Sequence, residues 1–273
     1  MKLHACTCVG PGSARVAVIP IAALMVVVFA SCGGDLKSPA APDTRSSAFV
    51  IENVFTTSRF AVDGALAYQV FLTLRETAGV GATTSQVTAT LADISGPATT
   101  AQLSATEAFG RTRITANGTL VSSGITVAGS LSKASDIMVQ VTLVDDHGKA
   151  GSAETSTGVK AQFTGEWSGP TTITQPPGDW STIRVSLIQS GDTLSGDFVT
   201  RDGRRFPVSG CVSCEGAPFV SVGGLPTGSS GCNIGLTFFE FAFWSGQMQR
   251  MSGRLGGRCP GTAVGTANLQ RSA

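Results

Sequence analysis

Short segments in which apolar and polar residues alternate follow one another along most of the chain, beginning near residue 48. In the first half they occur at residues 49–51 (FVI), 68–74 (YQVFLTL), 86–91 (QVTATL) and 137–144 (IMVQVTLV). A period of two residues is typical of β-strands with one buried face, and turn-forming residues separate these segments. Because no helical period accompanies it, the pattern predicts an all-β protein built from antiparallel sheets.

Residues 48–160 are predicted to form a β-sandwich of six to eight strands. Asn117-Gly118 lies between RTRITA and TLVSSG and predicts a hairpin with a type I′ turn, because both residues tolerate a positive φ. Residues 145–148 (DDHG) predict a second turn. The sequence around that turn, VQVTLVDDHGKAGSAETS, resembles the last hairpin of bacterial immunoglobulin-like modules. This resemblance implies an Ig-like β-sandwich.

Residues 163–273 are predicted to form a second β-domain. They contain eight strand candidates: 164–174, 182–189, 193–200, 205–212, 219–222, 233–243, 247–255 and 263–271. Sequential antiparallel strands joined by short turns favour an eight-stranded antiparallel barrel, which removes the free edges of a sheet. A second β-sandwich is the alternative.

Gly165-Glu166-Trp167, at the start of the first of these strands, resembles the G-x-W signature of lipocalins and their calycin relatives. The resemblance implies that Trp167 closes the base of a lipocalin-like barrel and that an arginine near the end of the last strand stacks on it. Arg271 has that position. The helix that precedes the last strand in lipocalins is missing from this sequence.

The segment LTFFEFAFW (236–244) has two apolar faces. Strand periodicity predicts Phe239, Phe241 and Phe243 on one face, pointing inward, where they would bind a small apolar ligand. Leu236, Phe238 and Trp244 would then form an outer patch for the first domain, a partner or the membrane. With the faces reversed, Glu240 would lie inside and need an arginine partner or a raised pKa. In a third interpretation, the aromatic side chains fill a solid barrel core.

Four cysteines lie in the second domain: Cys211, Cys214, Cys232 and Cys259. An even number in an exported chain predicts disulfides, and the sequence leaves all three connectivities open. We favour the pairs Cys211–Cys214 and Cys232–Cys259. A CxxC redox site and a Cys₄ zinc site are the rivals. A redox site would need a helix that lowers the thiol pKa, and the sequence predicts none there. A zinc site would need a second CxxC pair, so no metal is expected.

The amino-terminal residues predict export. Residues 16–30 (VAVIPIAALMVVVFA) form an uncharged segment of fifteen residues. This segment is too short for a membrane-spanning helix, but it has the length of the apolar region of a signal peptide, which we place at residues 1–31. Phe29-Ala30-Ser31-Cys32 resembles the bacterial lipobox, with Phe29 in place of the usual leucine. The resemblance implies acylation, palmitate included, at Cys32 and a membrane anchor. Gly33 after the cysteine implies sorting to the outer membrane. Residues 32–47 are Pro-rich and polar, which is typical of a flexible tether.

Charge and histidine content narrow the function. Without Lys2 and Arg15 of the signal peptide, 17 basic residues face 18 acidic ones, so nucleic-acid binding is not expected. His147 is the one histidine outside the signal peptide, and its place in a predicted turn is better explained by turn chemistry than by catalysis. No nucleophile–base pair, metal cluster or phosphate loop can be assembled from the sequence. The sequence therefore predicts a non-enzymatic envelope lipoprotein without a cofactor, whose barrel binds a small apolar ligand. The alternative is a structural or interaction lipoprotein with a solid barrel that meets an envelope protein or a glycan.

Overall fold

The structure is a computed structural model that describes residues 45–60, 65–172, 180–203, 205–212, 220–227, 232–257 and 265–272. The predicted signal peptide (1–31), Cys32 and the tether as far as residue 44 lie outside the described residues. Thr44–Ala273 forms one compact unit. Its described residues contain seventeen β-strands and one short α-helix, and all strand pairs are antiparallel, so the all-β prediction is confirmed.

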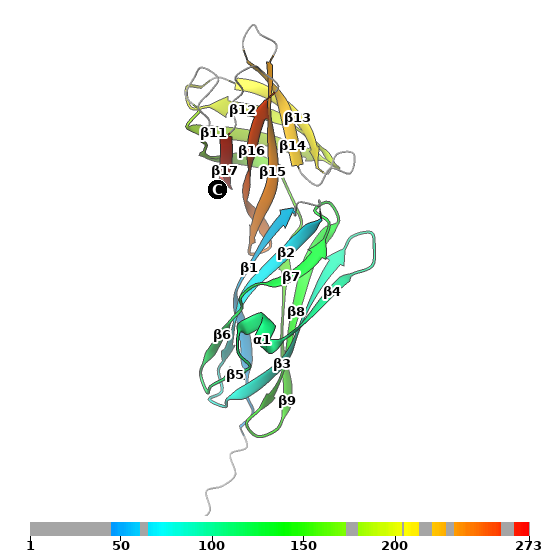
Figure 1. Ribbon diagram of the computed structural model, residues 1–273, viewed down its shortest axis with the longest axis vertical. Helices are drawn as coiled ribbons and strands as arrows, with labels where there is room; N and C mark the ends of the chain where they lie inside the picture. The colour runs from blue at the N-terminus through cyan, green and yellow to red at the C-terminus, as the bar shows by residue number, and fades with distance from the viewer. Residues whose placement is uncertain are drawn as a thin grey trace, which may run out of the picture. The chain divides into compact units, whose positions relative to one another are not determined.

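The first half of the unit has two layers (Figure 1). One layer consists of β1 (Phe49–Phe60), β2 (Leu66–Glu76), β6 (Thr119–Val121) and β7 (Ile125–Gly129). The other is a five-stranded sheet of β3 (Ala82–Asp93), β4 (Thr99–Ser104), β5 (Arg113–Ile114), β8 (Ala134–Asp145) and β9 (Ala150–Gly158). The four alternating segments predicted for this half all lie within β1, β2, β3 and β8.

Alternation along the strands produces the core between these layers. In β2, Tyr68, Val70, Leu72 and Leu74 are buried, and the residues between them are partly exposed. Val87 and Ala89 of β3 and Val139 and Val141 of β8 are buried in the same way on the facing sheet. The hydrophobic effect thus holds the two layers together through every second residue of their central strands.

The predicted hairpin at Asn117-Gly118 is wrong. The strand before it, β5, pairs with β3, and the strand after it, β6, pairs with β2, so the turn carries the chain from one layer to the other. Of the two turn residues, only Asn117 has a positive φ, of 55°, whereas a type I′ turn needs a positive φ at both. The turn is closed by a hydrogen bond from the Gly118 amide to the Thr115 carbonyl, at 2.9 Å.

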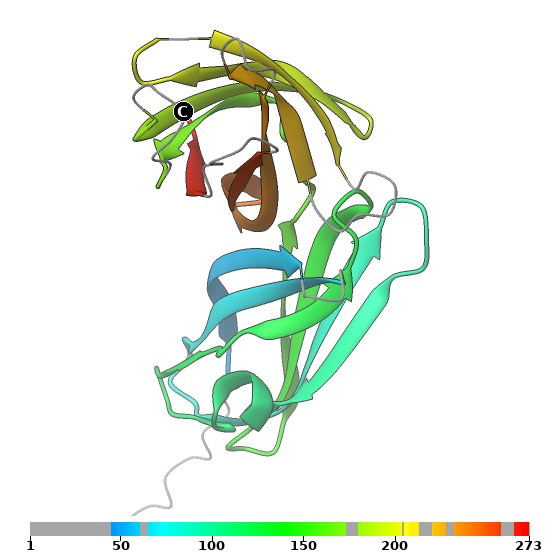
Figure 2. The same ribbon diagram turned by 45° about the horizontal axis from the view of Figure 1, so that its top comes forward.

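The second half contains eight strands in sequence order: β10 (Gly165–Pro170), β11 (Thr182–Ser190), β12 (Thr193–Thr200), β13 (Arg205–Val212), β14 (Val220–Thr227), β15 (Cys232–Trp244), β16 (Gln247–Gly257) and β17 (Gly265–Arg271). Each corresponds to a predicted strand. Consecutive strands pair, and β10 also pairs with β17, through Trp167 and Ser168 alone. The eight-stranded barrel stays a prediction. Figure 2 shows how strongly β11 to β14 curve.

Glycine allows some of this curvature. A Cβ atom on Gly196 of β12 would lie 1.8 Å from the carbonyl oxygen of Ser186 on β11. Glycines of this kind mark sharp bends and close approaches of backbones within a sheet. The close β11–β12 pairing therefore requires glycine at position 196.

The two halves share one sheet, because β15 pairs with β1. Five residues of β1, from Phe55 to Arg59, lie opposite the last five residues of β15, from Trp244 back to Glu240. The earlier part of β15 uses the same edge to pair with β14, and its other edge pairs with β16. The result is a twelve-stranded sheet that runs through both halves.

Glu76, at the end of β2, fixes the entry to β1. Its side chain is buried, and its carboxylate accepts hydrogen bonds from the backbone amides of Ala48 just before β1 (3.5 Å), Ala78 (2.7 Å), Gly79 (2.9 Å) and Asn117 (2.8 Å). Burial alone would raise the pKa of Glu76, but the hydrogen bonds from backbone amides, Asn117 first, outweigh it and lower the pKa below the usual value.

We expect Glu76→Gln to destabilise the fold near neutral pH by about 1–3 kcal/mol, since an amide NH₂ cannot accept these hydrogen bonds. A lowered pKa in the folded state means that ionised Glu76 stabilises the fold above its unfolded-state pKa of about 4.3. This contribution is lost as the pH falls through the folded-state pKa, so the deficit of the variant should shrink in acid.

The free energy of unfolding in urea, measured at neutral pH and at about pH 3, checks this. Glu154→Gln, at an exposed position on β9, is the matched control and should stay within about 0.5 kcal/mol of the wild type. A deficit for Glu76→Gln that does not depend on pH would contradict the proposed role of the ionised carboxylate.

Gly196→Ala should destabilise the protein by about 2 kcal/mol or more, because the new methyl group overlaps the Ser186 carbonyl and forces the strands apart. Gly256→Ala on β16 is the control, since a Cβ atom there meets nothing within 4 Å. Urea unfolding followed by tryptophan fluorescence compares the two variants. Equal effects would show that the close approach at position 196 is relieved without cost.

Candidate functional site

The aromatic segment lies on β15, and the alternation of its side chains between the two faces of the sheet is interrupted at Phe239. Phe238 lies opposite Gly253 of β16, whereas Glu240 lies opposite Ser252, so Phe239 is an extra residue in a β-bulge. Phe241 then lies opposite Met251, two positions from Gly253 along β16. Leu236 and Phe238 before the bulge therefore share a face with Phe241 and Phe243 after it, and all four are buried.

The prediction that Phe239, Phe241 and Phe243 share one face is wrong for Phe239, and the bulge is the reason. Phe239 is only partly buried, and the guanidinium carbon of Arg254 lies 5.7 Å from its ring centroid. The predicted outer patch is wrong for Leu236 and Phe238 for the same reason. Trp244 is exposed, as that prediction required.

Phe241 and Phe243 contact residues from elsewhere in the chain. The Phe241 ring lies 5.7 Å from that of Phe163, just before β10, in an edge-to-face arrangement. The Phe243 ring lies 6.2 Å from that of Tyr68 on β2. These side chains therefore pack where β15 meets the first half, and ligand binding by Phe239, Phe241 and Phe243 stays a prediction.

Small residues of β1 make room for these rings. In the register, Thr56 lies between Val70 and Phe243, and Ser58 lies between Tyr68 and Phe241. Both hydroxyl-bearing side chains are buried, and within the described part of the chain neither hydroxyl has a hydrogen-bond partner. An unpaired buried hydroxyl costs stability, so this packing carries a local penalty.

The opposite, exposed face of the same strands carries three aromatic rings side by side. Phe55 of β1 lies directly opposite Phe71 of β2 on one side and Trp244 of β15 on the other. The ring centroids are 5.6 Å apart for Phe55 and Phe71 and 5.7 Å apart for Phe55 and Trp244. We call Phe71, Phe55 and Trp244 the aromatic row. Trp244 is 54% exposed, which is high for a tryptophan in a strand.

A polar groove of about 210 Å³ lies beside the aromatic row. The groove begins at Thr57, which is the next residue of β1 after Phe55 on the same face. It extends across β2, β1, β15 and β16. The residues that line this groove include Ser58 and Phe241 at its floor and the polar residues Thr57, Arg59, Gln69, Glu240, Arg250 and Ser252. Glu240 lies on this exposed face, and its carboxylate is 3.2 Å from the Arg59 guanidinium directly across the strand pair. The arginine partner that Glu240 would have needed in the interior is thus present on the exposed face.

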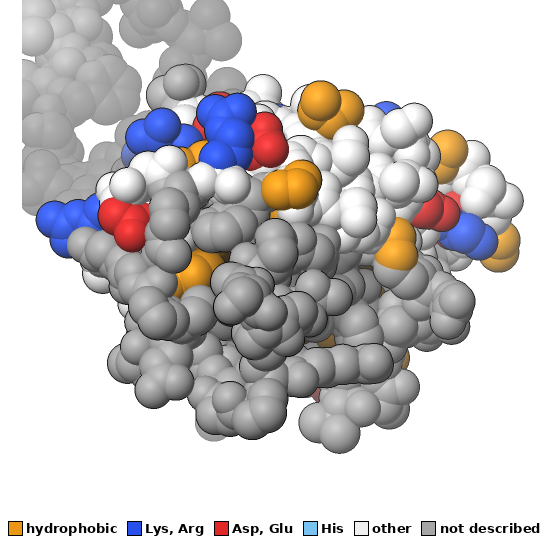
Figure 3. Space-filling model, turned by 90° about the horizontal axis from the view of Figure 1, so that it is seen from above, with side chains coloured by type: hydrophobic (Ala, Val, Ile, Leu, Met, Phe, Trp, Pro, Cys, Tyr) orange, Lys and Arg blue, Asp and Glu red, His pale blue; other side chains and the backbone are white. Residues whose placement is uncertain are grey.

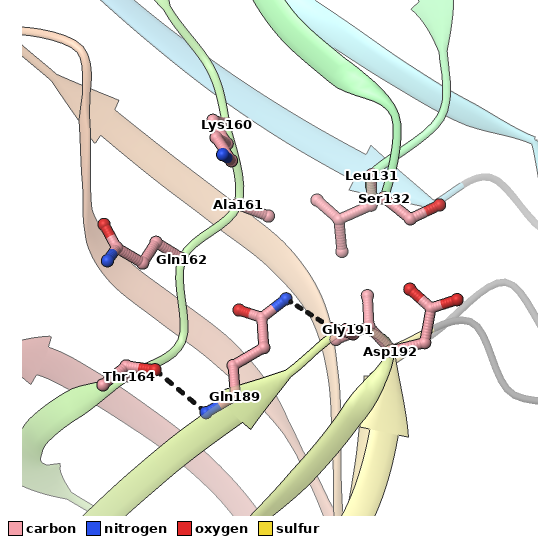
Figure 4. Close-up of a pocket in the computed structure, with 10 residues that line it drawn as sticks. Leu131, Ser132, Lys160, Ala161, Gln162, Thr164, Gln189, Gly191 and Asp192 are labelled. Atoms are coloured by element: carbon pink, nitrogen blue, oxygen red, sulfur yellow. Dashed lines mark hydrogen bonds between the residues drawn. The ribbon is translucent and has the colours of Figure 1, made fainter. Parts of the chain in front are cut away.

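A second hollow, of about 420 Å³, lies along the segment that leads into β10 (Figure 4). The side-chain oxygen of Gln189 accepts a hydrogen bond from the Phe163 amide at 3.0 Å, and its amide nitrogen donates to the Gly191 carbonyl at 3.1 Å. The Gln189 backbone amide donates to the Thr164 hydroxyl at 2.9 Å. These groups fasten the connecting segment to β11, so we assign this hollow a structural role.

The predicted contact between Trp167 and Arg271 is present. The guanidinium carbon of Arg271 lies 5.3 Å from the Trp167 ring centroid, and the two residues are opposite each other in the β10–β17 register. The Trp167 indole donates a hydrogen bond to the Phe163 carbonyl at 2.8 Å. Gly165 has a φ of 139°, and a Cβ atom there would lie 3.2 Å from the Arg271 side chain. Glycine at the first position of the G-x-W motif thus lets Arg271 lie over Trp167.

Cys32, Cys214 and Cys259 lie outside the described residues, as does the side chain of Cys232. Cys211, near the end of β13, is disulfide-bonded. The two predicted pairings stay predictions, because Cys214, Cys259 and the side chain of Cys232 lie outside the described residues.

His147 lies in the predicted turn between β8 and β9. Its backbone amide donates to the Asp145 carboxylate at 2.9 Å, and its Nδ1 lies 2.9 Å from the Arg45 carbonyl oxygen. Hydrogen bonds from backbone amides, that of Lys149 first, hold the pKa of Asp145 below its usual value. The histidine and its neighbouring carboxylate therefore serve turn geometry.

On the face that Figure 3 shows, the described hydrophobic side chains lie singly among polar and charged ones. Scattered exposed apolar side chains of this kind need no functional explanation. None of the helices within the described residues is long and apolar enough to span a membrane. Those residues also contain no group of three or more His, Cys, Asp or Glu side chains arranged to hold a metal ion.

No protein-family model matches the chain, and no curated protein sequence matches it. The functional argument therefore rests on the residues of this chain. Among the features described above, the aromatic row and the polar groove form the strongest candidate site, because they combine exposed rings with converging polar groups on one rigid sheet.

Thr56→Val should raise the free energy of unfolding by about 1 kcal/mol, because valine keeps the shape of threonine and removes a buried hydroxyl without a partner among the described residues. Thr57→Val, on the exposed face of β1, is the control and should give no such gain. Urea unfolding measures both. A loss of stability in Thr56→Val would mean that the hydroxyl is hydrogen-bonded in solution.

Proposed function

We propose that this protein is an exported bacterial lipoprotein, anchored to the outer membrane through acylated Cys32, that acts as a binding protein and not as an enzyme. In this proposal, the first half is an Ig-like sandwich and the second half is a lipocalin-like barrel. The lipobox at residues 29–32 supports the anchor. The G-x-W motif, the Trp167–Arg271 contact and the order of strand pairing support the lipocalin-like assignment.

The site of binding, in our proposal, is the exposed face of β2, β1, β15 and β16. The exposure of Trp244, at 54%, in line with Phe55 and Phe71 is the observation that carries this choice. Both halves contribute strands to this face, so it is held rigidly by backbone hydrogen bonds between them.

A small apolar ligand inside the second half is the alternative. The second half buries the apolar side chains of Phe198, Phe238 and Met251, which would surround such a ligand. We favour the exposed face as the binding site because Phe241 and Phe243, which were predicted to bind the apolar ligand, pack against other rings of the chain. Phe241 contacts Phe163, and Phe243 contacts Tyr68.

The test places a photo-crosslinking amino acid at position 244 of the full chain, expressed in a bacterium with an outer membrane. We expect the protein in the outer-membrane fraction and a crosslinked adduct with another envelope component. Position 188 is the matched control, because Ile188 is similarly exposed, at 61%, but lies on β11, which does not pair with β1 or β15.

Cys32→Ala should release the protein from the membrane fraction if the anchor is as proposed. Equal crosslinking at positions 244 and 188 would contradict the proposed binding face. Native mass spectrometry of the purified protein addresses the alternative, since a co-purifying apolar molecule would favour a ligand inside the second half.

A further inference from the structure

We propose that the aromatic row and the polar groove together bind an acidic polysaccharide. This inference rests on the proposed function and names the chemical class of the partner. One sugar ring would lie against Trp244, and a neighbouring sugar would place its hydroxyl and carboxylate groups in the groove.

The aromatic row provides the apolar part of such a site. A pyranose ring presents a face of C–H groups, which packs well against the electron-rich face of an aromatic ring. Trp244 is the most exposed member of the row, and the Phe55 ring, 5.7 Å away, supports it from one side. Strand pairing on both sides of Phe55 holds the row in place, so little side-chain entropy is lost on binding.

The groove provides hydrogen-bonding groups suited to sugar hydroxyls. The hydroxyls of Thr57 and Ser252 and the amide of Gln69 can each donate and accept. The volume of about 210 Å³ is below the range of about 300–1,000 Å³ that is usual for pockets of drug-sized ligands. A groove of this size suits one ring of a longer chain better than a complete compact ligand.

The charges of the groove favour an acidic sugar. Arg59 is already paired with Glu240, at 3.2 Å. Arg250 lines the same groove and is exposed, and it has no ion-pair partner within the described part of the chain. Arg254 follows on the same face of β16. The face therefore has an excess of positive charge, and a guanidinium binds a carboxylate well.

These charges also argue against the other occupants of an exposed aromatic row. An apolar protein surface seated on the row would cover Arg59, Glu240 and Arg250, and desolvating charges without new partners is unfavourable. A polysaccharide keeps these groups hydrogen-bonded and wet while its C–H faces cover the rings.

The experiment is isothermal titration calorimetry of the purified full-length lipoprotein in detergent, with two oligosaccharides of equal length. One is an oligogalacturonate, which carries a carboxylate on each sugar, and the other is a neutral cello-oligosaccharide. We expect the oligogalacturonate to bind more tightly, with an affinity that falls as salt is added.

Two variants separate the contributions of the rings and the charge. Trp244→Ala should weaken oligogalacturonate binding roughly three- to tenfold through the lost ring contact. Arg250→Gln should weaken it roughly two- to fivefold at low salt and remove part of the salt dependence. Ile188→Ala and Arg184→Gln, at exposed positions on β11, are the matched controls and should leave the affinity unchanged.

The proposal is overturned if neither oligosaccharide binds, if the neutral one binds as tightly as the acidic one, or if the β11 controls lose as much affinity as Trp244→Ala. The melting temperature of each variant shows whether it is folded. A protein crosslinked specifically at position 244, with no oligogalacturonate binding, would refute the polysaccharide inference and leave the proposed binding face in place. Equal crosslinking at positions 244 and 188 would instead refute the binding face itself.

Discussion

The pairing between β1 and β15 is the interaction on which the rest of the structure depends. A strand edge presents unpaired amide and carbonyl groups that must find partners, and β15 extends well past the end of β14. Its last five residues find those partners on β1, and the same pairing brings buried rings together on one side of the sheet and exposed rings on the other. The candidate site and the junction between the two halves are therefore consequences of one antiparallel ladder.

The bulge at Phe239 determines which side chains meet on each side of that ladder. Without it, Phe241 and Phe243 would face away from Leu236 and Phe238, and one of the two pairs would be left in solvent. With it, one strand keeps its apolar side chains in the interior of the second half and then, further along, against Tyr68 of the first half. Glu240 consequently points outward to Arg59.

Local patterns in the sequence were enough to locate the strands. All eight strands of the second half and the four alternating segments of the first half were predictable, because period-two alternation and turn residues are local signals. The Trp167–Arg271 contact was predictable from a motif. The helix α1 (Ala105–Phe109) was missed, although Ser104 and Glu107 form the S-x-x-E capping box that announces a helix start.

Features that depend on distant partners could not be predicted. A bulge such as that at Phe239 leaves no clear mark in a run of aromatic residues, so strict alternation assigned the wrong face. The segments on either side of Asn117-Gly118 had the pattern of a hairpin. In the structure they do not pair with each other, because the first pairs with β3 and the second with β2. The aromatic row joins residues 55, 71 and 244, and only the β1–β15 register reveals that they are neighbours.

The antiparallel ladder also has a mechanical consequence. The chain enters β1 at Phe49, so with the proposed anchor at Cys32 any tension from the membrane would reach the described structure through that strand. Because the hydrogen bonds of an antiparallel ladder run perpendicular to the strands, the component of such tension along β1 would shear the bonds to β2 and β15 together instead of opening them one at a time. The strand that joins the two halves is thus also the strand through which force would enter the molecule, and both halves would share it.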